Sequence, residues 1–274
     1  MILFNGQEII LHATPGIGDK LVVTFTSFEK SGGASTGGWQ GTVERLGFPG
    51  LFFISKQNHW FNSHELDTAV EIARKFRDQF KEALLTGASM GGHAALRLYS
   101  DLNASVTVAI SPQYCIRNEL VPFEKRWTQE SIKIKKYDRK IDEKCTKMNS
   151  YIIYDDNHEQ DKGHVDLISN KVECTRVPLS NSGHSSVRAL ADLKLLDLIF
   201  KFSGEEAENK ELLERINKKY KSDAYRSAHV IIQKASKMSL EERYTFLQNL
   251  PSNLLGITPS KKALEELKSK THGC

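Results

Sequence analysis

Five consecutive residues, Gly87-Ala88-Ser89-Met90-Gly91, have the types and spacing that can turn a serine into a nucleophile. They follow an apolar run at residues 83–85 and precede a helix-like stretch at residues 92–99. A serine with a glycine two residues to either side, between a strand and a helix, is typical of a nucleophile elbow, whose tight turn exposes the hydroxyl. The same pattern also occurs in glycine-rich turns without chemistry, so Ser89 needs partners elsewhere in the chain.

A histidine is the usual base for such a serine, because the hydroxyl is a poor nucleophile until its proton is removed. His184 is the predicted base. It lies in a polar loop at residues 179–186, after a strand-like segment and directly after Gly183, and it precedes an expected helix. Five other histidines are weaker candidates, namely His59, His64, His93, His158 and His164.

A carboxylate must orient that histidine, and it is expected in the loop after the apolar segment at residues 151–154. Asp161 is the first choice, because it stands just before an expected helix start at His164. Asp156, nearer the end of the strand, is the alternative. These residues also have a purely structural interpretation, as a helix N-cap for Asp161 and as a turn residue for Asp155 or Asp156.

Alternating apolar segments indicate the elements that would position these side chains. Strand signals alternate with helical spacing, which predicts a mostly parallel sheet covered on both faces. Two apolar runs around Asn5-Gly6 predict a hairpin at the N-terminus. The expected strands lie at residues 21–25, 51–54, 83–85, 106–110, 151–154 and 172–177, and the expected helices at 64–80, 92–99 and 185–202.

Two segments interrupt the alternation. Residues 113–150 are charged, with ten Lys/Arg against six Asp/Glu, and stand between two expected strands. Residues 204–274 have no strand signals and predict helices around 212–220, 224–235, from 239 onward and at 260–270. We therefore predict a core domain at residues 1–203 with an insertion at 113–150, followed by a C-terminal helical extension at 204–274.

The order Ser89, Asp161, His184, each after a successive strand, resembles the α/β-hydrolase superfamily over about residues 1–202. The resemblance implies an α/β fold with a mostly parallel sheet flanked by helices, and a small lid where the insertion stands. It also implies acyl transfer, in which Ser89 attacks a carbonyl, His184 moves the proton and the aspartate holds the imidazole.

The same resemblance implies an oxyanion hole made of backbone amides. Met90 would supply one amide, and Ser27 or Phe28, in the loop after the strand at 21–25, the second. This loop lacks the H-G-G-G pattern of lipases. Trp39 and Trp60 follow the early strands and are predicted to line the substrate pocket, although packing beneath a loop is an equal interpretation.

Composition limits which other classes of protein the chain could belong to. The net charge of +4 over 274 residues does not indicate nucleic-acid binding, and no stretch approaches the ~18 apolar residues of a membrane span. The N-terminus has no basic start and no continuous apolar run, so no signal peptide is predicted. Four scattered cysteines without metal-ligand spacing predict free thiols in a reducing cytoplasm, with no metal and no cofactor.

The sequence therefore predicts a cytoplasmic serine hydrolase that cleaves a small-molecule ester or thioester through an acyl-enzyme. A peptidase or an acyltransferase would use the same residues. The basic insertion suggests a lid over an anionic or polar substrate, with a solvated helical insertion as the alternative. From another class, the chain could be a non-catalytic scaffold whose residues 204–274 bind a protein partner or a second copy.

Overall fold

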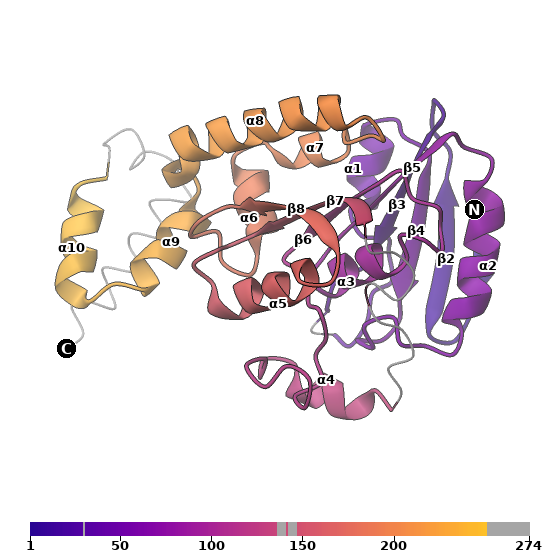
Figure 1. The fold of residues 1–274 in the computed structure, drawn as a ribbon, viewed down its shortest axis with the longest axis horizontal. Helices are drawn as coiled ribbons and strands as arrows, with labels where there is room; N and C mark the ends of the chain where they lie inside the picture. The colour runs from indigo at the N-terminus through magenta and orange to yellow at the C-terminus, as the bar shows by residue number, and fades with distance from the viewer. Residues whose placement is uncertain (30, 136–140, 142–146, 251–274) are drawn as a thin grey trace.

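An eight-stranded sheet forms the centre of the computed structural model, which describes residues 1–29, 31–135, 141 and 147–250 (Figure 1). The strand order is β1-β2-β4-β3-β5-β6-β7-β8. Strands β3 to β8 run parallel, whereas β1 and β2 form the predicted N-terminal hairpin and run antiparallel to their neighbours. The strands are β1 (Ile2–Asn5), β2 (Ile9–Thr14), β3 (Lys20–Phe25), β4 (Gly50–Ser55), β5 (Glu82–Ala88), β6 (Val106–Ile110), β7 (Lys147–Tyr154) and β8 (Glu173–Pro178).

Helices cover both faces of this sheet, because successive side chains of each buried strand point to opposite faces. Val23 and Leu85 pack with α2 (Leu66–Arg77) and α3 (Met90–Arg97), and α5 (Glu159–Ser169) lies on the same face. Val22 and Leu84 belong to the opposite layer, which contains α1 (Gln40–Arg45), α6 (Ser186–Asp192), α7 (Leu196–Ile199) and α8 (Glu206–Asp223). The predicted mostly parallel sheet flanked by helices is confirmed.

Two predicted helix boundaries differ from the structure. The helix expected over 185–202 is divided into α6 and α7, because Lys194 adopts a left-handed conformation with φ 56°. Helix α5 begins at Glu159 rather than at His164. The reason is a cap, since the His158 ring accepts a hydrogen bond from the amide of Asp161 at 3.3 Å. Asp161 consequently lies in the first turn of α5 and not in the preceding loop.

Of the two added segments, the C-terminal one is mainly helical where the structure describes it, whereas the described part of the insertion consists mostly of turns and loops with one short helix. Between β6 and β7 lies α4 (Thr128–Lys133), and residues 147–150 of the expected insertion belong to β7. After α8 come η1 (Ala224–Arg226), α9 (Ala228–Ser236) and α10 (Leu240–Gln248), with α10 at the opposite end of the molecule from α2 (Figure 1). Ser239 and Glu242 form the predicted capping box of α10. The helix expected at 260–270 lies outside the described residues.

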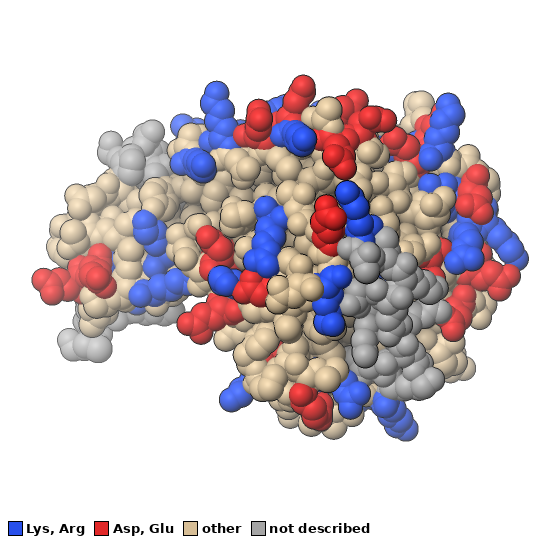
Figure 2. All heavy atoms as spheres, in the orientation of Figure 1, with Lys and Arg blue, Asp and Glu red and all other residues tan. Residues whose placement is uncertain are grey.

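Charged side chains of both signs are interspersed over the described part of the face in Figure 2, including α8. Within the described residues, no helix has the length and apolar character needed to cross a membrane. Cys115 and Cys174 carry free thiols.

Candidate active site

Ser89 occupies a sharp turn between β5 and α3. Its backbone has φ 52° and ψ −118°, a conformation that is rare for a non-glycine residue and is found at functional sites. The flanking glycines allow the turn to close. A Cβ on Gly91 would lie 2.3 Å from the carbonyl oxygen of Phe25, and one on Gly87 would lie 2.4 Å from the carbonyl carbon of Gly91. The G-x-S-x-G spacing therefore reflects the close approach of three backbone segments.

His184 and Asp161 lie in line with this serine. The Nε2 atom of His184 is 3.0 Å from Ser89 Oγ, and its Nδ1 atom is 2.9 Å from each oxygen of the Asp161 carboxylate. The loop after β8 supplies the histidine and the first turn of α5 supplies the aspartate. Asp156 instead accepts a hydrogen bond from the Ser180 hydroxyl at 2.7 Å. This geometry allows His184 to take the Ser89 proton while Asp161 fixes the orientation of the imidazole.

A buried ion network from the β6–β7 segment surrounds Asp161. Arg126 Nη1 is 3.0 Å from Asp161 Oδ1, and Arg126 also forms a 2.6 Å ion pair with the fully buried Glu124. Burial alone would raise the pKa of Asp161, but the hydrogen bond from His184 and the charges of His184 and Arg126 lower it below its ordinary value. Asp161 is therefore ionised at neutral pH, as an orienting carboxylate must be.

Glu124 is the acceptor at the far end of this network. His164 Nε2 donates to Glu124 at 2.9 Å, while His164 Nδ1 accepts the amide of Tyr114 at 3.3 Å. Burial opposes ionisation of Glu124, but the hydrogen bonds from His164 and Arg126 outweigh it and lower its pKa to about 2. His164 thus forms hydrogen bonds with Glu124 and Tyr114 and not with Ser89.

The other histidines also have partners away from Ser89 Oγ. His93 is buried in α3, its Nδ1 donates to the carbonyl of Gln113 at 2.9 Å, and burial lowers its pKa to about 3. His59 lies 3.2 Å from the Ser55 hydroxyl, and His64 pairs with Glu8 at 3.3 Å. Within the described part of the chain, no group of three His, Cys, Asp or Glu residues is arranged to hold a metal ion.

Gln113 is a site residue that the sequence analysis did not identify. It is fully buried, its Nε2 donates to Ser89 Oγ at 3.0 Å, and its Oε1 accepts the indole N–H of Trp60 at 3.0 Å. A signal for it was present: Gln113 follows Ser111 and Pro112 at the end of β6, the strand beside β5. Parallel neighbours end at one edge of a sheet, so the next side chain falls beside the elbow.

Three aromatic side chains form a wall beside His184 and Gln113. The ring centroids of Trp60 and Trp127 are 5.4 Å apart, and those of Phe28 and Trp127 are 4.8 Å apart. Trp127 also lies 5.9 Å from the His184 ring. Only Trp60 of these three was among the predicted substrate-binding residues. Trp127 and Arg126 come from the β6–β7 segment, whose contacts with the core could not be inferred from charge alone.

Backbone amides expected in the oxyanion hole are available. Among the hydrogen bonds of the described residues, none is donated by the amides of Ser27, Phe28 or Met90. Ser27 Oγ donates to the carbonyl of Ala88 at 2.9 Å, which holds the loop after β3 against the elbow. These three amides are therefore candidate donors near the turn at Ser89.

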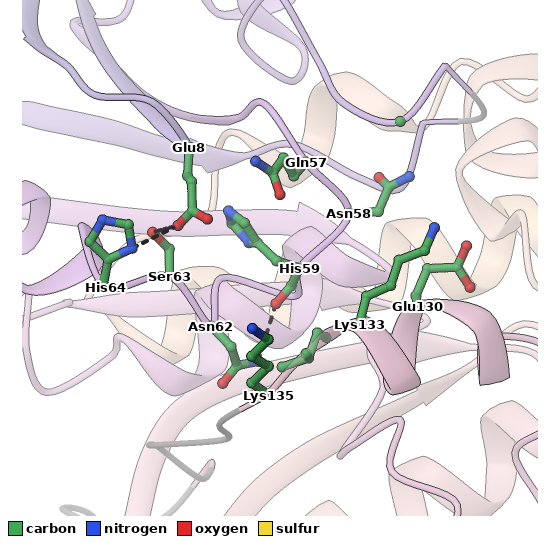
Figure 3. A pocket seen from close by; sticks show the side chains of 12 residues that line it. Glu8, Gln57, Asn58, His59, Asn62, Ser63, His64, Glu130, Lys133 and Lys135 are labelled. Atoms are coloured by element: carbon green, nitrogen blue, oxygen red, sulfur yellow. Dashed lines mark hydrogen bonds and ion pairs between the residues drawn. The ribbon is translucent and has the colours of Figure 1, made fainter.

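Two hollows lie along the loops that follow β3 and β4. Trp39 lines one of about 430 Å³ along the loop after β3 and packs edge-on against Phe200 at 6.0 Å. The other, about 700 Å³, lies between α4 and the loop after β4 (Figure 3). His59 lines this second hollow, and the next residue, Trp60, donates a hydrogen bond to Gln113. Labelled side chains around this second hollow include Glu8, Gln57, Asn58, Asn62, Ser63, His64, Glu130, Lys133 and Lys135 (Figure 3).

Comparison with known proteins finds solved structures that are similar to this chain at low sequence identity. No family model and no curated protein matches the chain. The capsule O-acetyltransferase of Neisseria meningitidis serogroup A is similar over 67% of this chain and 87% of its own, with 14% identity and a TM-score of 0.51. An α/β serine hydrolase without a lid from Xanthomonas campestris is similar over 68% of this chain and 84% of its own, with 17% identity and a TM-score of 0.42. An α/β serine hydrolase homologue from Coxiella burnetii is similar over 72% of this chain and 94% of its own, with 14% identity and a TM-score of 0.45.

The chain has the α/β-hydrolase fold, as predicted. The strand order and the strand-turn-helix around Ser89 carry this assignment, since the order places the elbow strand β5 between β3 and β6 in a parallel sheet. The similarity to the capsule O-acetyltransferase, at 14% identity and a TM-score of 0.51, supports the fold and nothing finer.

Proposed function

We propose that the protein is a serine hydrolase that cleaves an ester or thioester through an acyl-enzyme. The observation that carries the proposal is the unbroken line of hydrogen bonds from Ser89 through His184 to Asp161. His184 takes the hydroxyl proton as Ser89 Oγ attacks the carbonyl carbon, and then gives that proton to the leaving alcohol or thiol. Water, deprotonated by the same imidazole, attacks the acyl-enzyme and releases the acid.

Stabilisation of the tetrahedral intermediate falls to the amides of Met90 and of Ser27 or Phe28. Each lies at or next to the elbow and donates no other hydrogen bond in the described structure. A preorganised donor of this kind is worth about 3–4 kcal/mol of transition-state stabilisation. The loop after β3 therefore contributes to the rate although it supplies no member of the triad.

An uncharged substrate fits this site better than an anionic one. Trp60, Trp127 and Phe28 offer apolar contact beside the triad. Arg126 is neutralised by Glu124 and Asp161 and offers no free charge to a substrate. In this proposal residues 113–135 of the β6–β7 segment act as a lid, and Trp127 contacts the substrate. Matched neutral and anionic esters test this: faster turnover of the anionic ester would contradict it.

Acyl transfer to an alcohol acceptor is the second candidate. Ser89 is only 9% exposed and lies beside the aromatic wall, and exclusion of water from an acyl-enzyme favours a bound acceptor. The structural neighbour from Neisseria meningitidis is an O-acetyltransferase, which shows that this fold supports such a reaction in that protein. The ratio of transfer product to acid, measured with increasing alcohol, separates the two activities.

A fluorophosphonate probe tests the proposed nucleophile directly. The folded wild-type protein should be labelled and Ser89→Ala should not, while the exposed Ser100→Ala is a matched control that keeps its labelling. Absence of labelling in the folded wild-type protein would overturn the proposal and favour the non-catalytic scaffold.

A further inference from the structure

The loop that carries His184 lies against the helices that follow the core. The hydroxyl of Tyr220, in α8, donates to the carbonyl of Ser180 at 2.9 Å. His229, in α9, lies with Nε2 2.7 Å from the carbonyl of Ser182. A carbonyl only accepts, so the His229 ring carries its hydrogen on Nε2. Both bonds hold the main chain of the loop and are independent of its side chains.

The opposite side of the same loop is held by Asp155, at the end of β7. Its two carboxylate oxygens accept the amides of Asn181 and Gly183, each at 2.8 Å. Lys237, just after α9, donates to the carbonyl of Asn157 at 2.9 Å and lies 3.5 Å from the Asp155 carboxylate. The main chain of each of the four residues before His184 is therefore held by a hydrogen bond. Ser180 and Ser182 are held by the helices, and Asn181 and Gly183 by Asp155.

Packing keeps the two helices in place. Ile216 of α8 and Val230 of α9 are buried in the same apolar cluster as Val177, at the end of β8, and Leu190 of α6. Helix α9 also lies against α6, which follows the His184 loop (Figure 1). The helices are thus anchored to the strand before the loop and to the helix after it.

We propose that α8 and α9 form a clamp that sets the position of His184, with Tyr220 and His229 as its positioning residues. The inference rests on the proposed function, in which His184 is the base for Ser89. Proton transfer depends steeply on the 3.0 Å separation of His184 Nε2 and Ser89 Oγ. Loss of a clamp bond lets the loop occupy a wider range of positions, so the chemical step slows while substrate binding does not change.

The experiment compares Tyr220→Phe and His229→Ala with the wild-type protein by the rate of fluorophosphonate labelling and by kcat and KM. Each variant should lose about tenfold in labelling rate and in kcat, the order expected for one hydrogen bond, with KM unchanged. His229→Gln should recover most of the rate, because its amide nitrogen donates from a similar position. Tyr244→Phe, an exposed tyrosine of α10, and His64→Ala, an exposed histidine, are the matched controls and should keep the wild-type rate.

The outcomes are distinct. A folded wild-type protein without labelling overturns the proposed function and the clamp together. A labelled wild-type protein whose Tyr220→Phe and His229→Ala variants react at the same rate overturns the clamp alone. The clamp proposal is also overturned if the variants label at the wild-type rate when the assay is run well below their melting temperatures. Global unfolding would then account for the loss of rate. His229→Gln reacting no faster than His229→Ala overturns the role of His229.

Discussion

The two halves of the candidate active site are built in different ways. Ser89 is placed by one continuous segment, in which β5, the turn and α3 follow each other directly. Asp161 and His184 are placed by contacts that are distant in sequence, with Arg126 on one side and Tyr220 and His229 on the other. The proposed nucleophile is therefore positioned locally, whereas the two groups proposed to activate it are positioned by segments added before β7 and after β8.

This difference predicts different consequences of substitution. Close backbone contacts around Ser89 make that half sensitive to added volume, which lowers stability. The hydrogen bonds and ion pairs around His184 and Asp161 make the other half sensitive to the loss of single polar groups, which lowers the rate or, where a buried ion pair is lost, the stability. Four predictions test the contrast, starting with the largest effect.

Asp161→Asn should reduce kcat by about 10,000-fold, because an amide cannot hold His184 in the tautomer that accepts the Ser89 proton. Asp156→Asn is the matched control, since the Asp156 carboxylate bonds the Ser180 hydroxyl and not His184, and this variant should keep most of the activity. Steady-state kinetics on one ester measure both variants. Equal losses in the two variants, or a greater loss in Asp156→Asn, would mean that the acid has been wrongly assigned.

Glu124→Gln should lower the free energy of unfolding by about 3 kcal/mol at pH 7, because it leaves Arg126 and His164 with a neutral partner in a buried site. The pKa of Glu124 is depressed to about 2 from 4.5. Its contribution is thus fully present above about pH 4.5 and is lost as the pH falls toward about 2.

Urea unfolding between pH 7 and pH 3 measures this contribution. The difference between the wild-type protein and Glu124→Gln should shrink as the pH falls through this range. Glu119→Gln, which changes an exposed carboxylate on the same segment, should alter stability by less than about 0.5 kcal/mol. A pH-independent difference would show that the charge of Glu124 is not what stabilises the segment.

Gly91→Ala should lower the free energy of unfolding by about 2 kcal/mol, because its methyl group would meet backbone atoms of Phe25 that cannot move independently. Gly41→Ala, in α1, is the matched control. No heavy atom lies within 4 Å of the position of its added Cβ, so it should be neutral or stabilise by up to about 1 kcal/mol. Denaturant unfolding of both variants checks the pair, and equal effects would mean that close backbone contact does not explain the glycine spacing of the elbow.

Local patterns were sufficient to predict the sheet, the hairpin and the elbow. Alternation of apolar strands with helices defined the α/β class, and the glycine spacing around Ser89 reported a steric requirement of the turn itself. His184 and Asp161 were also selected from their positions after late strands. The structure brings both residues together with Ser89, because each follows a strand that ends at the common edge of the parallel sheet. Their catalytic roles stay predictions.

Long-range contacts could not be predicted. The preference for Asp161 over Asp156 rested on an expected helix start at His164, whereas α5 in fact begins at Glu159 through the His158 cap. Asp155 was interpreted as a turn residue, yet it lies buried and holds the His184 loop. Nothing in the charge balance of the two added segments indicated that Arg126 or His229 would reach the site.

The smallest predicted effect is a coupling between two residues that hold the same loop. Asp155→Asn turns an amide N–H toward a backbone N–H, and Tyr220→Phe removes the bond to Ser180. Because both act on one loop, their effects on labelling rate should be non-additive by about 0.5–1 kcal/mol, a factor of about two to five.

The control is a second double-mutant cycle, which combines Tyr220→Phe with Gly91→Ala. Gly91 lies in the other half of the site, in the turn around Ser89. These two share no partner among the described contacts, so their effects should add within about 0.5 kcal/mol. Coupling in the first cycle and additivity in the second would show that the loop is one unit, separate from the elbow. The reverse pattern would mean that the elbow and the His184 loop move together, and the distinction between a local and a long-range half would have to be abandoned.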